Sequence, residues 1–296
     1  MKNIKLREST KILKMKIIQF LLQLRYYVFC FRKPLKVGFM RLYNEENTVI
    51  ACLMSVVDML DKIVLIYSDI DDCSLELVKQ YIKDKRLEQK IIIRRYPHHV
   101  YTQNAEQYSG NYQWENTLAA YYLFGYDICR KLARFRNGFI AKVDADQIYM
   151  NDCFNKIEQE MKKAKYVRII NSFGGYNGYV NQKDNSYRVL CRPKWGRLNG
   201  GAGDHLCIPF GLCGTVTFRM DINAEHAWEV LEMPTKYYRF KRQYDEVMWF
   251  HFNQKKPQSG ALQGLTEEEY NDYMQKIFPL LETAKSKYVQ LKIMRQ

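Results

Sequence analysis

The chain has 296 residues, 47% of them hydrophobic, which is enough apolar material for the core of one large domain. It has no internal repeat. Its eight cysteines include no C-x-x-C pair, which argues against a zinc site and predicts reduced, buried thiols in a cytosolic protein. The net charge of +14 is uneven, because residues 1–36 hold ten Lys or Arg residues against one acid and so carry +9.

The basic segment, residues 1–36, contains a predicted amphipathic helix. Its apolar residues Ile17, Leu21, Leu24 and Val28 recur at helical spacing, and cationic residues flank them. The stretch is too short and too charged for a transmembrane helix, which needs roughly 20 apolar residues. We therefore expect an arm that lies on an anionic membrane surface, peripheral on the inner, cytoplasmic face of the cell membrane. A helix that packs on its own domain is the alternative.

Residues 37–150 alternate between predicted strands and helices. The strands are nearly continuous in apolar residues, which is typical of a parallel sheet covered by helices on both faces, and we predict this α/β fold. Asn44 or Asn47 is the expected N-cap of the first helix. The polar and aromatic segment 98–116 predicts a surface loop that shapes a site. Strands are predicted in VGFMRL, KIVLIY, KIIIRRYP and GFIAKVD, and helices in TVIACLMSVVDML, SLELVKQYIKDK and TLAAYYLFGYDICRKLARF.

Acidic clusters follow two of these strands, at residues 69–72 and 144–146. In a parallel sheet, ligands bind beyond the carboxyl ends of the strands. Only alanine separates Asp144 from Asp146, so both carboxylates can reach one Mg²⁺ or Mn²⁺ ion together with phosphate oxygens. Such a cation would neutralise the charge on a departing diphosphate. An ordinary acidic turn after a strand is the alternative.

The segments RLYNEENT, IYSDIDDCS and KVDADQIY, in this order, resemble the nucleotide-binding half of family 2-like GT-A glycosyltransferases. More closely, residues 37–155 resemble bacterial lipooligosaccharide β-1,4-N-acetylgalactosaminyltransferases, with weaker similarity at RQYDEVMWFHF. The resemblance implies a GT-A domain at 37–253, with a nucleotide-sugar half at 37–155 and an acceptor half at 156–253. It implies metal-dependent, inverting transfer of a hexose or N-acetylhexosamine from a UDP-sugar to a lipooligosaccharide, lipopolysaccharide or related glycan.

The resemblance also implies roles for residues of the donor site. By position, it places Arg41, Asn44 and Glu45 in the nucleotide pocket and Asp69 on the uracil. Many family 2 members have D-D-G-S where this chain has DDCS, without the glycine. The contacts of residues 69–73 with the nucleotide therefore stay open.

The implied metal site uses both aspartates of the DAD sequence. Asp144 would lie near the ribose and the metal, and Asp146 would bind the metal directly. His251 would complete the site, as a late histidine does in some GT-A enzymes, with a packed core histidine as the alternative. Lys142, two residues before Asp144, could face either the core or the diphosphate.

The second half supplies the acceptor side of the prediction. Segments 171–185 and 192–214 are rich in Gly, Asn and aromatic residues, which suit sugar binding, although irregular loops have the same composition. An inverting transfer needs a base for the acceptor hydroxyl. We expect Asp245 in this role, then Glu246, with Asp204 as a further candidate. Asp245 and Glu246 begin a predicted helix, DEVMWFHF. As the alternative to a catalytic role, either acid could be the N-cap of this helix.

The tail, residues 254–296, predicts an amphipathic helix capped by Thr266 and interrupted by Pro279, packed on the domain or on a partner. Two other functions stay open. A sugar-phosphate nucleotidyltransferase should have a Gly-rich phosphate signature, which residues 37–50 lack. A nucleic-acid-binding protein is disfavoured because the charge lies on an apolar helix. The expected partners are a UDP-sugar, a glycolipid or oligosaccharide acceptor and a membrane, and no nucleic acid.

Overall fold

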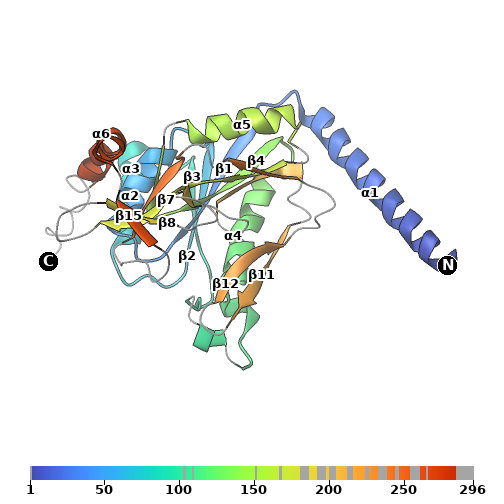
Figure 1. The fold of residues 1–296 in the computed structure, drawn as a ribbon, viewed down its shortest axis with the longest axis horizontal. Coiled ribbons are helices and arrows are strands. Elements are labelled where there is room, and N and C mark those ends of the chain that lie inside the picture. Colours follow the sequence, from blue (N-terminus) through green and yellow to red (C-terminus); the bar gives the residue numbers. More distant parts are fainter. Residues whose placement is uncertain are drawn as a thin grey trace.

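The computed structural model describes most of the chain between residues 2 and 284, and these residues form a mixed α/β fold around a mostly parallel sheet (Figure 1). The described ranges are 2–102, 105–108, 110–150, 152–166, 169–180, 187–191, 198–199, 205–211, 216–223, 227–232, 239–243, 247–253, 261–264 and 266–284.

The helices are α1 (Lys2–Phe29), α2 (Val49–Val56), α3 (Ser74–Lys85), α4 (Leu118–Leu132), α5 (Cys153–Lys163) and α6 (Glu267–Ala284), with short 3-10 helices η1 (Ala105–Tyr108) and η2 (Trp114–Asn116). The strands are β1 (Leu35–Leu42), β2 (Lys62–Tyr67), β3 (Ile91–Arg95), β4 (Gly138–Asp144), β5 (Gln147–Tyr149), β6 (Ile169–Phe173), β7 (Gly175–Val180), β8 (Tyr187–Cys191), β9 (Leu198–Asn199), β10 (Leu206–Pro209), β11 (Thr217–Ile222), β12 (Ala227–Glu232), β13 (Arg239–Gln243), β14 (Trp249–Asn253) and β15 (Ala261–Gly264).

The central sheet has the strand order β13-β6-β10-β4-β1-β2-β3. β4, β1, β2 and β3 run parallel to one another, whereas β10 is antiparallel to both of its neighbours. The parallel strands are rich in buried apolar residues; in β2, KIVLIY, the four central residues are buried. The predicted strands and helices between residues 37 and 150 are therefore confirmed, and Thr48, not Asn44 or Asn47, occupies the N-cap position of α2.

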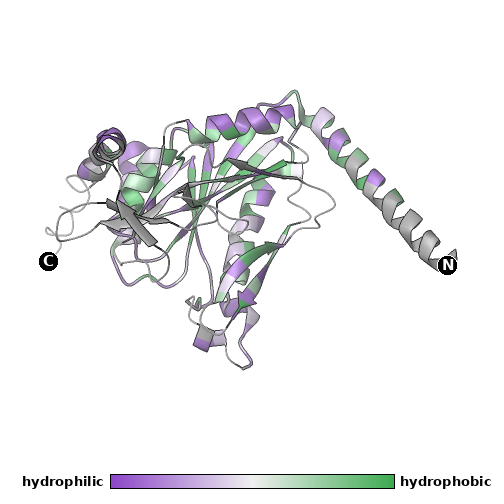
Figure 2. Cartoon of the chain, viewed as in Figure 1, coloured by the Kyte–Doolittle hydropathy of each residue, from purple (hydrophilic) through white to green (hydrophobic). Residues whose placement is uncertain are grey.

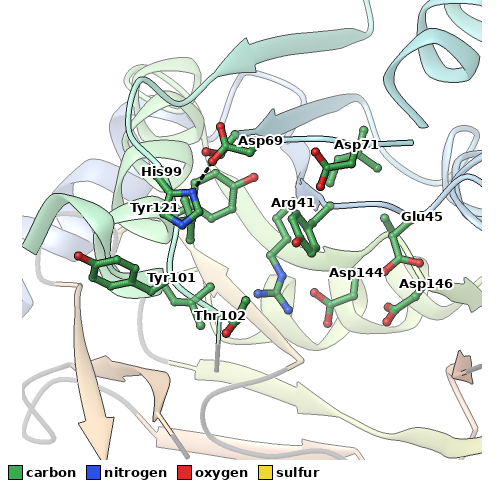
Figure 3. Close-up of a pocket in the computed structure, with 16 residues that line it drawn as sticks. Arg41, Glu45, Asp69, Asp71, His99, Tyr101, Thr102, Tyr121, Asp144 and Asp146 are labelled. Atoms are coloured by element: carbon green, nitrogen blue, oxygen red, sulfur yellow. Dashed lines mark hydrogen bonds and ion pairs between the residues drawn. The ribbon is translucent and has the colours of Figure 1, made fainter. Parts of the chain in front are cut away.

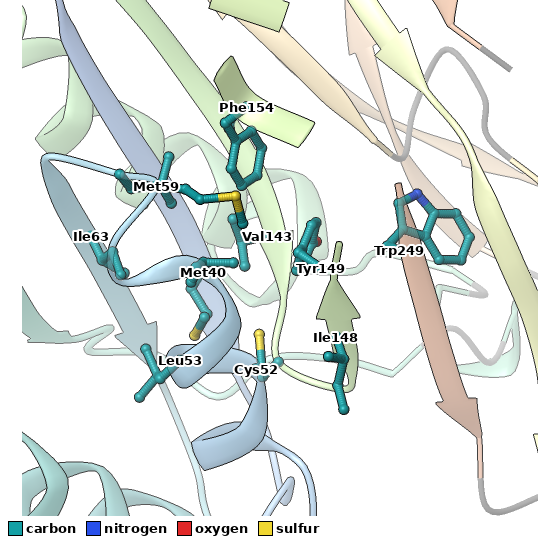
Figure 4. Packing of buried hydrophobic residues seen from close by; sticks show 14 of the residues in the cluster. Met40, Cys52, Leu53, Met59, Ile63, Val143, Ile148, Tyr149, Phe154 and Trp249 are labelled. Carbon is teal, nitrogen blue, oxygen red and sulfur yellow. The ribbon is translucent and has the colours of Figure 1, made fainter. Parts of the chain in front are cut away.

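Helices cover both faces of this sheet because alternate strand residues enter two separate cores. Met40 of β1 packs in one core with α2, α3 and α5, and Figure 4 shows part of this core. The next residue along the strand, Phe39, packs in the other core with α4. At Gly125 of α4, an added Cβ would lie 2.2 Å from the Phe39 ring, so this close approach of helix and strand requires glycine.

A second sheet, β15-β8-β7-β14-β5, adjoins the first where β5 follows β4. The predicted helix DEVMWFHF is wrong, because Trp249–Asn253 is β14, which pairs antiparallel with β5 and parallel with β7. Met248, Trp249 and Phe250 are all buried. A short run that is apolar on every side lacks the periodicity that distinguishes a strand from a buried helix.

A hairpin of β11 and β12 covers α4, with the Phe218 ring against Tyr122.

The two terminal helices differ in how they join the domain. α6 continues through Pro279 to Ala284, so the predicted interruption is wrong, and it packs on α2, with Leu280 against the core. This contact places the tail on its own domain. It also stabilises α6 at Pro279, where the proline has no backbone N–H to donate to the helix. α1 projects from the body of the domain (Figure 1). No helix in the described part of the chain is long and apolar enough to cross a membrane.

Candidate functional site

A pocket of about 520 Å³ opens at the carboxyl edge of the central sheet. β1, β2 and β4 end there, and residues 99–102 and the first turn of α4 close its sides. Figure 3 shows charged side chains from strand ends and from the loops after them that point into this space. The charged lining includes five residues that the sequence predicted for the site, together with Asp71. These five are Arg41, Glu45, Asp69, Asp144 and Asp146.

Asp144 is the last residue of β4 and is almost fully buried. Its Oδ2 lies 3.1 Å from Nζ of Lys142 and 3.4 Å from Nε2 of His205. Burial raises the pKa of Asp144, but Lys142 and His205 outweigh burial and hold this pKa well below its usual range. Among the described residues, its Oδ1 has no hydrogen-bond partner. Asp144 is therefore an ionised carboxylate with one uncommitted oxygen, and Lys142 faces this carboxylate.

Asp146 lies in the turn between β4 and β5, and its Oδ2 is 2.6 Å from Nε2 of His251. The pairing of β14 with β5 sets His251 opposite Gln147, which explains the contact. Burial alone would lower the pKa of His251 and raise that of Asp146. The attraction between the two groups outweighs burial, so the pKa of His251 is raised and that of Asp146 is lowered. The contact between the two groups therefore favours the charged form of each.

Arg41 supplies the cation of the pocket. It lies beside Asp144 because the parallel register of β1 and β4 pairs these two residues. Its guanidinium lies over the ring of Tyr122, with 5.4 Å between the guanidinium carbon and the ring centroid. Burial lowers the pKa of Arg41, but Tyr122 and the surrounding carboxylates outweigh it and raise the pKa, so the residue stays charged. A planar guanidinium of this kind binds phosphate or carboxylate oxygens in pairs.

Glu45 faces the same space from the loop after β1 (Figure 3). Burial and the nearby Asp146 raise the pKa of Glu45 to about 8, although Oγ1 of Thr48 donates a hydrogen bond to its carboxylate. At neutral pH the ligand-free protein therefore holds a proton on Glu45. A bound cation would favour its release, because positive charge stabilises the ionised form.

We expect Glu45→Gln to stabilise the ligand-free protein increasingly as pH rises. Between the ordinary pKa of 4.5 and the folded value of about 8, the folded protein binds a proton that the unfolded chain does not, so rising pH costs the wild type stability. Glutamine cannot titrate and avoids this loss. Thermal unfolding in EDTA should show the Tm difference widening by several degrees from pH 5 to 8, since one kcal/mol shifts Tm by roughly 2–4 °C. Glu88→Gln, which removes an exposed carboxylate, is the control. Parallel curves for the wild type and Glu45→Gln would mean that Glu45 is already ionised in the fold.

Asn44 does not line the pocket, in contrast to the role that the resemblance implies for it. It has a positive φ of 52° and accepts a hydrogen bond on Oδ1 from the backbone N–H of Asp71, at 2.9 Å. The backbone N–H of Glu45 likewise donates to Oγ of Ser74, at 2.7 Å. The loops after β1 and β2 are therefore joined side by side. At Cys73, where the resembled sequences have glycine, φ is −85°, which any residue can adopt, so the DDCS turn does not require glycine.

Asp69 follows β2 and stands at the rim of the pocket. Its Oδ2 is 2.6 Å from Nδ1 of His99, and the His99 ring meets that of Tyr101 edge to face (Figure 3). Residues 99–102 therefore form one wall of the pocket, as expected for a segment that shapes a site. Tyr121 adds another ring from α4. This end of the pocket combines aromatic faces with a carboxylate acceptor, which suits a planar base that has an N–H group.

His205, at the start of β10, is a buried residue behind the site that sequence reasoning missed. Its Nε2 is 2.9 Å from Oε1 of Gln147, and its ring stacks on Trp249 with 4.2 Å between the ring centroids. With its contact to Asp144, it fixes the orientation of this carboxylate. The signal in the sequence is weak, because His205 merely precedes an apolar run. Only the antiparallel pairing of β10 with β4 brings it to the aspartate.

Glu229 of β12 is a second residue that sequence reasoning missed, and only 5% of it is exposed. It interacts electrostatically with Arg41 and Tyr122. Among the described residues, its Oε2 has no hydrogen-bond partner. Ala227 and Leu231 occupy the alternate positions of the same strand face. The sequence could have indicated this residue, because an acid stands between apolar residues at alternate positions of a strand. A carboxylate buried in this way costs free energy unless another group compensates for it.

The predicted base candidates Asp204, Asp245 and Glu246 lie outside the described residues. The chain resumes at Val247, which packs against the core directly before β14. Within the described ranges, no three His, Cys, Asp or Glu side chains are close enough together to hold a metal ion by themselves. Any cation at Asp144 and Asp146 would therefore share its ligands with phosphate oxygens or water.

Fold and site together define a mixed α/β protein with a charged pocket at the carboxyl ends of parallel strands. A scan against protein-family models finds no match to this chain, and a search of curated proteins finds no match either. The functional inference therefore depends on the geometry of the pocket and on the sequence resemblance described above.

Proposed function

We propose that this chain is a metal-dependent, inverting GT-A glycosyltransferase. Its proposed reaction moves a hexose or N-acetylhexosamine from a UDP-sugar to a lipooligosaccharide, lipopolysaccharide or related glycan. The observation that carries the proposal is the convergence of Asp144, Asp146 and Arg41 at one pocket on the carboxyl edge of a mostly parallel sheet. Nucleotides bind at this edge in open α/β sheets, and two carboxylates beside a guanidinium suit a diphosphate with its cation.

The residues present fit Mn²⁺ or Mg²⁺, which prefer carboxylate and phosphate oxygens. Asp144 would contribute the oxygen that has no hydrogen-bond partner among the described residues, and Asp146 a second carboxylate. His251 is the third proposed ligand; its Nε2 contacts Asp146 in the ligand-free protein, so it would have to leave that contact and bind the cation as a neutral imidazole. The cation, when bound, would supply Lewis-acid stabilisation to a diphosphate leaving group.

The remaining residues of the pocket have distinct proposed roles. Arg41 would hold the diphosphate with its guanidinium, which stays charged and faces the two aspartates. At the other end, Asp69 would accept the N–H of uracil, with Tyr101 and Tyr121 beside the ring. The acceptor would approach from the second half of the chain, where the proposed base, Asp245, is located. The predicted domain division at residues 37–155 and 156–253 follows this separation of donor and acceptor roles.

UDP is expected to raise the Tm of the protein strongly with Mn²⁺ present and only weakly in EDTA. Cation and diphosphate share one site under the proposal, so each strengthens the binding of the other. At about 100 times Kd, binding adds about 2.7 kcal/mol, or roughly 5–10 °C for a domain of this size. The measurement is a thermal-shift titration of UDP with Mn²⁺, with Mg²⁺ and with EDTA, and ADP and GDP serve as nucleotide controls.

Equal UDP shifts with Mn²⁺ and with EDTA would remove the metal-dependent proposal. A larger shift with UTP plus a sugar 1-phosphate would instead favour a nucleotidyltransferase, which joins these two substrates and releases pyrophosphate. Release of UDP from a panel of UDP-sugars, with and without a lipooligosaccharide acceptor, then identifies the donor. Acceptor-dependent release of UDP without pyrophosphate is the result expected of a glycosyltransferase.

A further inference from the structure

A stripe of exposed apolar side chains runs along α1. Six residues form it, and between 46 and 63% of each is exposed, far above the level of a packed side chain. They are separated by three or four positions, so they share one side of the helix. We call this side the outer face of α1; it consists of Ile17, Phe20, Leu21, Leu24, Tyr27 and Val28.

On its other side, the C-terminal half of α1 is docked on the domain. Leu22 is buried in the core that contains α4, and Ile18 and Tyr26 pack against the same core. Nη2 of Arg25 donates hydrogen bonds to the backbone carbonyls of Ala133, at 2.9 Å, and Arg136, at 3.0 Å. These contacts fix the rotation of the helix about its axis. Tyr27, at the edge of the outer face, still touches the domain, because its hydroxyl accepts a hydrogen bond from Nζ of Lys165 at 2.6 Å. The rest of the outer face is turned away from the domain, and its side chains stay about half exposed or more in the folded chain.

From this arrangement we propose that the outer face of α1 binds the surface of a lipid bilayer that contains anionic phospholipids. The aromatic ring of Phe20 and the four aliphatic side chains of the outer face would enter the boundary between headgroups and acyl chains, with Tyr27 at the edge of the contact. Figure 2 shows hydrophilic residues interleaved with hydrophobic ones along the described part of α1. Lys16, Arg32 and Lys33 are exposed beside or just beyond the stripe, where they can reach lipid phosphates.

Charge distinguishes a bilayer from a second copy of the chain as the occupant of this face. Spacings of three and four residues also suit a two-stranded coiled coil. A second copy would bring another segment of residues 1–36, with +9, against the first, so the two would repel each other. An anionic bilayer instead attracts each cation near its surface by about 1 kcal/mol. This contact is independent of the transfer chemistry and of the donor pocket.

The test is co-sedimentation of the full chain with vesicles. We expect binding to an equimolar mixture of phosphatidylcholine and phosphatidylglycerol, little binding to pure phosphatidylcholine, and release at 1 M NaCl, where the screening length falls to about 3 Å. The double variant Phe20→Ser/Leu24→Ser should weaken binding at least about tenfold, because each side chain contributes on the order of 1 kcal/mol or more at the interface. Point variants are sharper than deletion of residues 1–36, which would also remove Leu22 from the core and Leu35 from β1.

The matched control is Ile222→Ser/Trp228→Ser, which changes two exposed apolar residues of the β11–β12 hairpin and should leave vesicle binding unchanged. An unchanged Tm for both variants shows that the fold is intact. Equal sedimentation with neutral and anionic vesicles, or full binding by the Phe20→Ser/Leu24→Ser variant, overturns the proposal. A lipid-free dimer in sedimentation velocity that this variant converts to monomer also overturns it, because the face would then be an interface between copies.

Discussion

Asp146→Asn is expected to abolish sugar transfer, with kcat/KM falling by about three orders of magnitude or more. Under the proposed function, the Asp146 carboxylate binds the cation that stabilises the leaving diphosphate, and such a cation supplies several kcal/mol. Each 1.36 kcal/mol is a factor of ten in rate. Asparagine keeps the shape of the side chain and an oxygen near Nε2 of His251, so this variant removes charge while it preserves most of the packing. UDP binding in Mn²⁺ should weaken together with turnover.

Asp146→Asn must also be shown to fold. Asp146 makes its hydrogen bond and ion pair with His251, and 29% of its side chain is exposed, so we expect the variant to stay folded with a lower Tm in EDTA, because this attraction is lost. Asp221→Asn, which alters an exposed acid on the β11–β12 hairpin, is the matched control and should retain full activity. Retained transfer by Asp146→Asn would remove this residue from the metal site. A loss of activity that follows a loss of folded protein would leave the carboxylate with a structural role.

Asp245→Asn is expected to lower kcat by about 10²–10⁴-fold, the usual effect of a positioned general base. Donor binding should be almost unchanged, because the Asp245 carboxylate would face the acceptor hydroxyl and not the diphosphate. The measurement combines turnover under saturating donor with a UDP titration in Mn²⁺. The Asp245 variant and the Asp146 variant therefore separate in the titration, where only the second should bind UDP weakly.

Two parallel variants determine which acid is the base. Normal turnover by Asp245→Asn, together with a loss in Glu246→Gln or in Asp204→Asn, would transfer the role to the residue whose change is damaging. Activity in all three variants would contradict a base from any of these acids. The buried carboxylate of Glu229, which interacts with Arg41 from β12, would then be the next acid to test.

The first half of the fold was predictable because its signals are local. Near-continuous apolar strands alternate with helices, and this pattern specifies a parallel sheet before any tertiary contact is known. The parallel register then follows, and with it the meeting of Arg41 and Asp144 at one edge. The acidic sequence after β4 therefore predicted the location of the pocket without knowledge of the second half of the chain.

The rest depends on contacts that no local pattern encodes. Trp249–Asn253 is a strand because β5 and β7 lie on either side of it, while its own sequence suits a buried helix equally well. His205 reaches Asp144 only through the pairing of β10 with β4. The resemblance placed Asn44 in the nucleotide pocket, yet its left-handed backbone and its hydrogen bond with Asp71 make it part of a loop junction. In each case a long-range partner decided the outcome.

The contact between Asp146 and His251 joins positions 105 residues apart in the chain. A ribosome must therefore have made the chain through residue 251 before the two groups can meet. Pairings of such high sequence separation form late and slow the folding of a domain. Residues 37–155 synthesised alone would contain the sequence motifs of the donor half, but β5 would lack its partner β14 and Asp146 would lack its imidazole. The two halves have different proposed roles, but the first half cannot complete its site when it is expressed alone. A chimera that exchanges halves between homologous chains would therefore have to preserve the β5–β14 pairing.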